Sequence, residues 1–166
     1  SDGTPADGGW TRHLMAIVDG VFDVVVADFN RDGKPDFAVS AYDAAEVHAY
    51  LNSVGVGGIW ADVTVKSSAS GPRGIDAADF DSDGDIDLLF VQRDNDLILW
   101  YENDGTGSTW AGHTVGAGAL NDGVAALAVD LDDDGDMDVV GTSQEDGDVV
   151  VWRNGGDGTT WVRTFI

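Results

Sequence analysis

The sequence predicts an all-β protein made of repeated four-stranded antiparallel units. One nine-residue motif, D-x-[DN]-x-D-G-x-x-D, occurs three times and begins at Asp28, Asp79 and Asp130, two intervals of 51 residues. Short apolar and β-branched runs flank each copy, and no segment has an extended helical periodicity. A period near 50 residues with four short strands per unit is typical of a propeller blade.

The second repeat shows the predicted order of elements. The unit has a first strand over 75–79, the motif, a second strand over 87–91, a polar turn over 93–96, a third strand over 97–102, a turn over 103–109 and a fourth strand that begins at Trp110. Glycine, which tolerates positive φ, is frequent in these turns. We therefore expect tight hairpins between consecutive strands.

Two further landmarks keep the same period. Asparagine ends each third strand, at Asn52, Asn103 and Asn154, and tryptophan opens outer segments at Trp10, Trp60, Trp110 and Trp161. We interpret these tryptophans as packing residues, because one indole ring buries a large apolar area. Trp100 and Trp152 lie on third strands, and we interpret them in the same way, with a sugar-stacking platform as the alternative.

The period divides the single repeat domain, 1–166, into three units over about 18–67, 68–117 and 118–166, with 10–17 as an extra outer strand. The surplus strand is either this segment or 161–166. Three blades cannot close a ring, and open blade faces imply a partner. A homodimer would give six blades in a closed cyclic arrangement; the alternative is that the chain is part of a larger propeller.

The repeated motif predicts one calcium site per copy. Calcium prefers oxygen ligands, and the motif places them at positions 1, 3, 5 and 9, with glycine at position 6 for a sharp turn. The predicted side-chain ligands are Asp28, Asn30, Asp32 and Asp36 in the first copy, Asp79, Asp81, Asp83 and Asp87 in the second, and Asp130, Asp132, Asp134 and Asp138 in the third.

An EF-hand is the obvious competitor for this motif, but it needs a bidentate Glu at position 12 and a helix on each side. Position 12 is Val39, Phe90 or Gly141 here. An acidic turn without a metal is the other alternative, since Asp and Gly are common turn residues. Three copies in register favour the metal site.

The net charge of −23 arises from 31 acidic and only 8 basic residues. Nucleic acid and anionic membrane surfaces are therefore poor partners. No apolar run approaches the roughly 20 residues of a membrane span, so we expect no membrane insertion. Calcium loops of modest affinity function where calcium is millimolar, which favours a secreted, extracellular protein.

The three loops, the segment from Trp100 to Gly105 and the Trp-x-x-His segments at Trp10 and Trp110 together resemble the FG-GAP/VCBS family of β-propeller repeats, whose calcium loops also occur in integrin α-chain propellers. The resemblance covers about residues 10–166. It implies calcium coordination by side chains at positions 1, 3, 5 and 9 and by the carbonyl at position 7. The implied carbonyl ligands are those of Lys34, Asp85 and Asp136. The first loop departs from the pattern through Asn30 and Pro35, so we expect it to be the weakest site.

The resemblance also implies adhesion and carbohydrate recognition, so we expect a non-catalytic binding module. The segments before each first strand supply mixed donors and acceptors for sugar hydroxyls, namely Asp19, Arg73, Asn121 and Asp122. An architectural fragment of a larger secreted protein is one alternative. A propeller polysaccharide lyase or hydrolase is another, although the repeated aspartates are better used by calcium than by acid–base catalysis.

Overall fold

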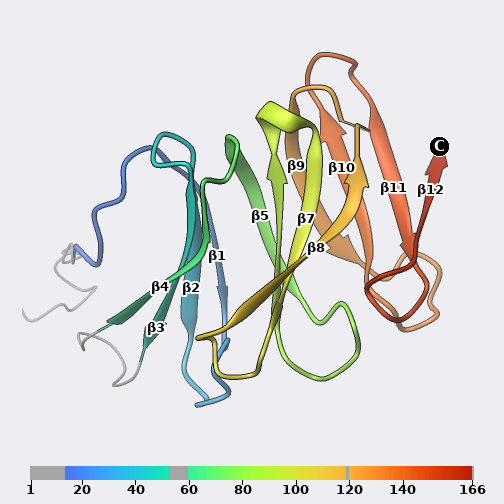
Figure 1. Cartoon of the computed structure of the whole chain (residues 1–166). Coiled ribbons are helices and arrows are strands. Elements are labelled where there is room, and N and C mark those ends of the chain that lie inside the picture. Colours follow the sequence, from blue (N-terminus) through green and yellow to red (C-terminus); the bar gives the residue numbers. More distant parts are fainter. Residues whose placement is uncertain (1–13, 53–59, 119, 166) are drawn as a thin grey trace, which may run out of the picture.

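The computed structural model describes residues 14–52, 60–118 and 120–165. These form three antiparallel sheets of four strands, and consecutive strands are neighbours in each sheet (Figure 1). The strands are β1 (Val21–Ala27), β2 (Asp36–Ala41), β3 (Glu46–Asn52) and β4 (Trp60–Ser67) in the first sheet; β5 (Pro72–Ala78), β6 (Asp87–Gln92), β7 (Leu97–Asn103) and β8 (Trp110–Ala117) in the second; and β9 (Gly123–Val129), β10 (Asp138–Ser143), β11 (Val149–Asn154) and β12 (Trp161–Phe165) in the third. The predicted all-β fold with three four-stranded blades is confirmed.

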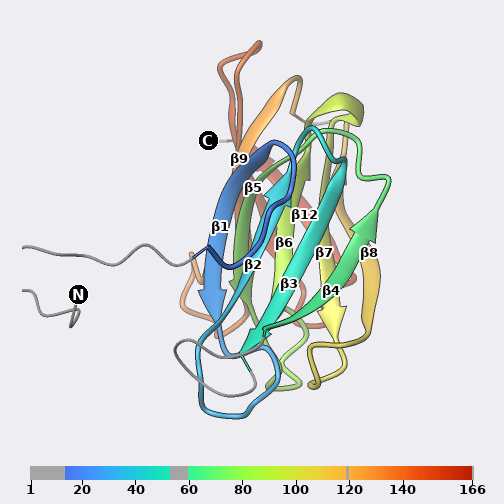
Figure 2. The same cartoon turned by 90° about the vertical axis from the view of Figure 1, so that its left-hand side faces the viewer.

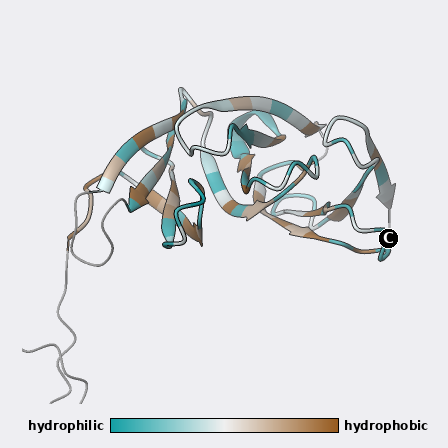
Figure 3. Cartoon of the chain, turned by 90° about the horizontal axis from the view of Figure 1, so that it is seen from below, coloured by the Kyte–Doolittle hydropathy of each residue, from teal (hydrophilic) through white to brown (hydrophobic). Residues whose placement is uncertain are grey.

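The three sheets stand side by side as consecutive blades (Figures 1 and 3). Their first strands are tied by hydrogen bonds from backbone to side chain. The Ile75 amide donates to Asp23 Oδ2 at 3.2 Å, and the Ala128 amide donates to Asp76 Oδ2 at 2.9 Å. These bonds join β1 to β5 and β5 to β9, so the first strands of neighbouring blades lie next to each other.

Each pair of neighbouring blades encloses its own hydrophobic core. Between the first two blades, Phe29, Val47 and Leu51 pack with Phe90 and Tyr101 of the middle blade. An equivalent core between the second and third blades contains Phe80, Ile98, Trp100, Val139 and Trp152. The middle blade is covered on both faces, and β6 is accordingly buried along its whole length.

We call the face of a blade that is directed toward the preceding blade its front face, and the opposite one its rear face. In a strand, successive side chains point to opposite faces. Leu88 and Phe90 of β6 therefore belong to the front face, and Leu89 and Val91 to the rear face, which agrees with their membership of the two cores. Residues 51 positions apart occupy equivalent places in different blades.

Two of the periodic tryptophans, Trp110 and Trp161, pack between blades as predicted, and Trp10 lies outside the described residues. Trp110 meets Phe29 edge-on, with ring centroids 5.7 Å apart, and Trp161 meets Phe80 at 6.2 Å. Trp100 and Trp152 are only 1% and 3% exposed. Because their rings are buried between blades, the alternative that either one forms a sugar-stacking platform is wrong.

The predicted surplus outer strand is not present in the described residues. Residues 161–165 form β12, which pairs with β11 and completes the third sheet. Residues 14–17 form no strand, and 10–13, with Trp10, lie outside the described residues. Each blade receives its fourth strand from the segment that opens with Trp60, Trp110 or Trp161, so 161–166 is not a surplus strand. The part of the predicted extra strand over 10–13 stays a prediction.

Across the described part of the chain, no helix is long and apolar enough to cross a membrane. A single turn of 3₁₀ helix, η2 (Arg93–Asn95), connects β6 to β7.

Candidate metal sites

The three acidic motifs form the turns between the first and second strands of the three blades, all at the same end of the sheets (Figure 1). Each turn needs two residues in the left-handed region. Position 4 is occupied by Arg31, Ser82 or Asp133 with φ between 57° and 62°, and position 6 by glycine with φ between 80° and 97°. Glycine reaches this region without strain, which explains its place in every copy.

The position-1 aspartate organises each turn in the same way. One of its oxygens accepts a hydrogen bond from the position-6 glycine amide, at 2.8 Å in the first loop, 2.9 Å in the second and 3.0 Å in the third. The position-5 aspartate accepts from the position-7 amide at 3.0, 2.7 and 3.0 Å. The backbone at Lys34, Asp85 and Asp136 therefore lies directly beside the position-5 carboxylate.

The carboxylates at positions 1, 3 and 5 converge. In the second loop Asp79, Asp81 and Asp83 each offer an oxygen, and these oxygens all lie within 4.8 Å of one another; the third loop groups Asp130, Asp132 and Asp134 in the same way. In the first loop Asp28 and Asp32 have Asn30 between them, and the Asn30 side-chain oxygen accepts from the Asp32 amide at 3.0 Å.

Two oxygens in these groups are buried without a hydrogen-bond partner. They are Oδ1 of Asp79 and Oδ1 of Asp130, at position 1 of the second and third loops. A buried carboxylate oxygen without a donor is costly, and native proteins rarely contain one. An oxygen-liganded cation such as calcium would satisfy both atoms, and the donor set is the one that calcium prefers. The residues therefore fit the predicted metal.

The position-9 aspartates play a different part in the fold. Asp87 is fully buried, and its two oxygens accept hydrogen bonds from the Phe80 amide at 3.0 Å and the Asn103 amide at 2.9 Å. Asp36 and Asp138 make the equivalent pairs of bonds. Burial raises the pKa of Asp87 to about 7, although the two amides and its charged neighbours also act on it. These aspartates join the turn to the end of the third strand, and the converging groups consist of positions 1, 3 and 5.

Basic side chains approach the loops, a feature that the motif alone does not predict. Lys34 Nζ lies 2.8 Å from Asp32 Oδ2 in the first loop. Arg153, from β11, contacts Asp132 and lies 3.5 Å from Asp138 Oδ2 in the third. Arg31 of the first loop pairs with Asp85 of the second. Arg153 and Asp132 are 21 positions apart, so only the pairing of β11 with β10 brings them together.

The charges in the loops shift two further pKa values in opposite directions. Burial raises the pKa of Asp81, and the charges of Asp83, Asp79 and Glu102 add to this effect. The hydrogen bond from Lys34 lowers the pKa of Asp32. The second loop is thus crowded with negative charge, whereas the first has its own compensating cation.

A model of the FG-GAP-like repeat matches residues 28–90 and again residues 79–141. The two matches overlap at the second acidic loop and together cover more than half of the chain. The chain belongs to the FG-GAP-like repeat family. Each match runs from one acidic turn through the next into a following second strand, and the two matches begin 51 residues apart, which is the period of the repeat. A comparison with curated proteins found no match.

The predicted ligand-binding residues lie at the opposite end of the FG-GAP blades from the acidic loops. Asn121 and Asp122 line a polar cavity of about 280 Å³ together with Arg93, Asp94, Asp96 and Glu145. Arg93 donates from Nε to Asp122. Arg93 and Glu145 were missed because each belongs to a turn after a second strand, outside the segments that precede the first strands.

The other two predicted residues do not line this cavity. The Arg73 guanidinium lies over the rings of Phe22 and Tyr42, at 5.4 and 5.7 Å, and 3.7 Å from Asp122 Oδ1. The Asp19 carbonyl accepts from the Ala44 amide at 3.2 Å. Arg73 therefore lies near the cavity residue Asp122 without lining the cavity itself, and Asp19 takes part in a turn of the first blade.

Proposed function

We propose that this protein is a calcium-stabilised β-propeller module that binds carbohydrate or surface ligands outside the cell. The proposal of calcium binding rests on two buried oxygens without a hydrogen-bond partner, Oδ1 of Asp79 and Oδ1 of Asp130, each of which lies in a group of converging carboxylates. Exposed acidic clusters are common without a metal, but a buried oxygen without a donor is not.

In the second loop, calcium would be held by Asp79, Asp81 and Asp83, and the third loop has the equivalent three aspartates. Asp28, Asn30 and Asp32 would hold it in the first. The bound ion would supply the positive charge that these groups otherwise lack. Asp87 and its equivalents orient the turn through backbone amides, and the resemblance adds them and the position-7 carbonyls as ligands.

Calorimetric titration with calcium tests this assignment. We expect three calcium ions per chain, and two after Asp79→Ala, because the variant removes the position-1 ligand from one loop. Asp94→Ala, which removes an exposed carboxylate outside the loops, is the matched control and should leave three. Fewer than two ions bound by the unaltered chain would contradict the proposal.

The polar cavity near Asn121 and Asp122 is the best-supported ligand site. It combines guanidinium, amide and carboxylate groups, which are the donors and acceptors that fix a hydroxyl-rich ligand. A position between the second and third blades is also typical of ligand sites, which favour junctions between structural units. The secreted location is proposed on the grounds of calcium supply alone.

Binding to a glycan array, with calcium and with chelator, tests the ligand assignment. We expect binding in calcium that is reduced at least tenfold by Asn121→Ala or Glu145→Ala, two cavity residues. Thr106→Ala, an exposed residue at the opposite end, should not change it. Unaltered glycan binding by both cavity variants would contradict this site, and no binding by the unaltered chain would favour the architectural role.

A non-catalytic role is supported by the way the most perturbed carboxylate is used. The Asp87 side chain, with its pKa of about 7, is fully buried and has both oxygens bound to backbone amides. A general acid or base must reach the substrate. Cleavage of a uronate-containing polysaccharide by the purified chain would contradict this part of the proposal.

A further inference from the structure

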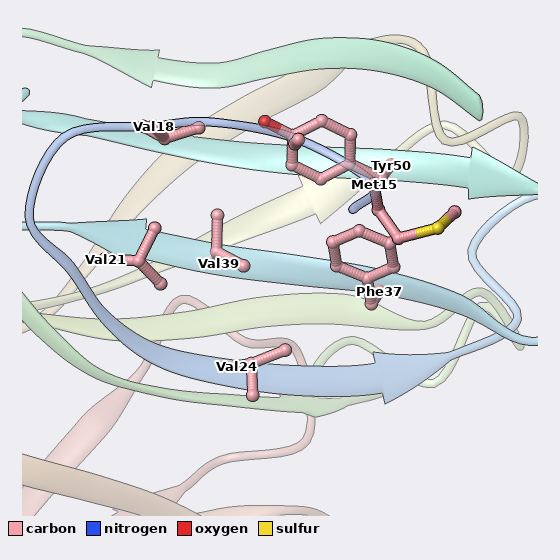
Figure 4. A pocket seen from close by; sticks show the side chains of 8 residues that line it. Met15, Val18, Val21, Val24, Phe37, Val39 and Tyr50 are labelled. Carbon is pink, nitrogen blue, oxygen red and sulfur yellow. The ribbon is translucent and has the colours of Figure 1, made fainter. Parts of the chain in front are cut away.

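The front face of the first blade carries an apolar hollow of about 310 Å³ (Figure 4). The blade residues that line it include Val24, Phe37, Val39 and Tyr50. The segment 15–18 crosses part of this face (Figures 2 and 4), but Ile17 remains 86% exposed. Val39 and Tyr50 are only 6% and 3% exposed, but Val24 is 56% exposed. The described part of the chain therefore covers the inner part of this apolar surface and leaves the part around Val24 open.

The same positions in the other blades are packed against a neighbouring blade. The equivalents of the four lining residues are Ile75, Leu88, Phe90 and Tyr101 in the second blade and Ala126, Val139, Gly141 and Trp152 in the third. All four in the second blade belong to the core shared with the first blade, and Ala126, Val139 and Trp152 to the core shared with the second. The hollow is thus the surface on which this fold places the rear face of another blade.

The rear face of the third blade is the complementary surface. Leu131 is 43% exposed, whereas its equivalents Phe29 and Phe80 are 0% and 1% exposed. Val149 is 52% exposed, and the side chains at its equivalent positions in the first and second blades are buried. Within the described residues, no following blade covers these side chains, whereas a following blade covers their equivalents.

A polar contact at each internal junction indicates how the two open faces would meet. Asn103 of the second blade donates from Nδ2 to the Phe29 carbonyl of the preceding loop, at 2.7 Å, and Asn154 donates to the Phe80 carbonyl at 2.8 Å. The third member of this series would be a bond from Asn52 to the carbonyl of Leu131. Leu131 is exposed on the rear face of the third blade. Asn52 is on the front side of the first blade, where it is 2% exposed and donates to the Pro35 carbonyl at 3.2 Å, as Asn103 donates to the Ile86 carbonyl.

The charges at the edges of the two faces are also complementary. At the first junction, Arg31 at loop position 4 pairs with Asp85 at position 7 of the next loop. At a junction between the third blade and a first blade, the same two positions hold Asp133 and Lys34. Here the acidic residue is at position 4 and the basic residue at position 7, the reverse of the first junction, so the two charges are again opposite.

We propose that two copies of this chain associate head to tail, the rear face of each third blade packing on the front face of the other copy's first blade. A head-to-tail interface either closes into a ring or continues into a filament. Two copies joined in this way would bring six of the described blades together, which is within the range of four to eight blades that propellers have. This inference rests on the blade packing and on the charges at the blade edges rather than on the proposed calcium sites.

Sedimentation velocity and light scattering over a concentration series test the proposal. We expect a species with twice the 17.4 kDa mass of the chain. Two exposed positions on each face can be altered without entering a core: Leu127→Lys with Val149→Lys on the rear face, and Val24→Lys with Val26→Lys on the front face. Each doubly altered chain should be a monomer, whereas Thr114→Lys with Ala117→Lys, on the outer strand of the middle blade, should not change the mass.

Mixing the two face variants distinguishes head-to-tail from face-to-face association. One interface in the mixture still combines an unaltered front face with an unaltered rear face, so the mixture should associate although neither variant does alone. Association of either face variant by itself would overturn the head-to-tail arrangement. An unaltered chain that stays monomeric at all concentrations, or that forms any larger assembly, would overturn the two-copy ring.

Exchange of the charge pair gives a second test that leaves the apolar faces intact. Asp133→Arg places two cations at the junction and Lys34→Asp places two acidic groups there, so each alone should weaken association about fivefold or more, a typical scale for an exposed ion pair. The double variant reproduces the Arg31 and Asp85 pair and should restore the affinity. Independent, additive effects of the two substitutions would contradict the proposed contact.

Discussion

Removal of calcium is the perturbation to which this fold should respond most. Each complete acidic group holds three carboxylate oxygens within 4.8 Å of one another. At this separation a pair of charges repels by about 0.9 kcal/mol even in bulk water, so three pairs give about 3 kcal/mol in each loop. A chain with a net charge of −23 has few cations with which to offset this.

The expected loss of stability can be estimated from the number of sites. Calcium in hundredfold excess over its dissociation constant stabilises a folded protein by about 2.7 kcal/mol per site, or about 8 kcal/mol for three sites. For a chain of this length, each kcal/mol changes the melting temperature by about 2–4 °C. Chelation should therefore lower the melting temperature by about 16–32 °C, or unfold the chain at room temperature.

Thermal unfolding followed by tryptophan fluorescence, in calcium and in EDTA, measures the effect. Magnesium in place of calcium is one control, because its octahedral preference suits these loops poorly. Sodium chloride at about 1 M is another, since it reduces the Debye length to about 3 Å and screens repulsion without ligating the loops. A melting temperature in EDTA within about 5 °C of that in calcium, or one fully restored by salt alone, would show that bound calcium does not stabilise the fold.

Three further outcomes follow from individual side chains. Asp83→Ala should lower the melting temperature in calcium more than Asn30→Ala, since it removes a carboxylate from a complete set; equal temperatures would contradict this ranking. Arg153→Gln should tighten calcium binding at the third loop about fivefold by removing a competing cation, the scale of one surface ion pair, and calorimetry would show no change if the guanidinium does not compete. Burial disfavours the charged form of His48, but the hydrogen bonds between its ring and two carboxylates outweigh this effect and raise its pKa. Its contribution is therefore present below its ordinary pKa and is lost as pH rises through the raised value, so the stability difference from His48→Gln should shrink as pH rises above about 6.5. A difference that does not change with pH would show that the proton on His48 does not contribute.

The repeat made most of the fold predictable from the sequence. The sequence predicts that the ninth residue of the acidic motif opens the second strand of each blade. The strands β2, β6 and β10 do begin at Asp36, Asp87 and Asp138. The Asn and Trp landmarks similarly marked the ends of third strands and the starts of fourth strands. Because the period is regular, the three copies can be aligned, and a strand wrongly assigned in one copy would disagree with the strands of the other two.

The parts of the site that escaped prediction depend on contacts between elements. The approach of Arg153 to the third loop requires the pairing of β11 with β10, and the contact between Arg31 and Asp85 requires one blade to pack on the next. The polar cavity combines turns from the second and third blades. A motif specifies the residues within one loop, but it does not specify which distant side chains the blade packing will bring to that loop.

The position-9 aspartate and the third-strand asparagine show why metal binding and blade packing should be coupled. The Asp87 carboxylate accepts a hydrogen bond from the backbone amide of Asn103, and the Asn103 side chain donates to the carbonyls of Ile86 and Phe29. Ile86 belongs to the same acidic loop as Asp87, but Phe29 belongs to the loop of the preceding blade. Two buried residues thus connect each loop to the loop before it, and we expect a change in one loop to affect the other. Calcium sites on such connected loops need not behave independently, and the loss of one ion should weaken both the adjoining junction and the neighbouring site.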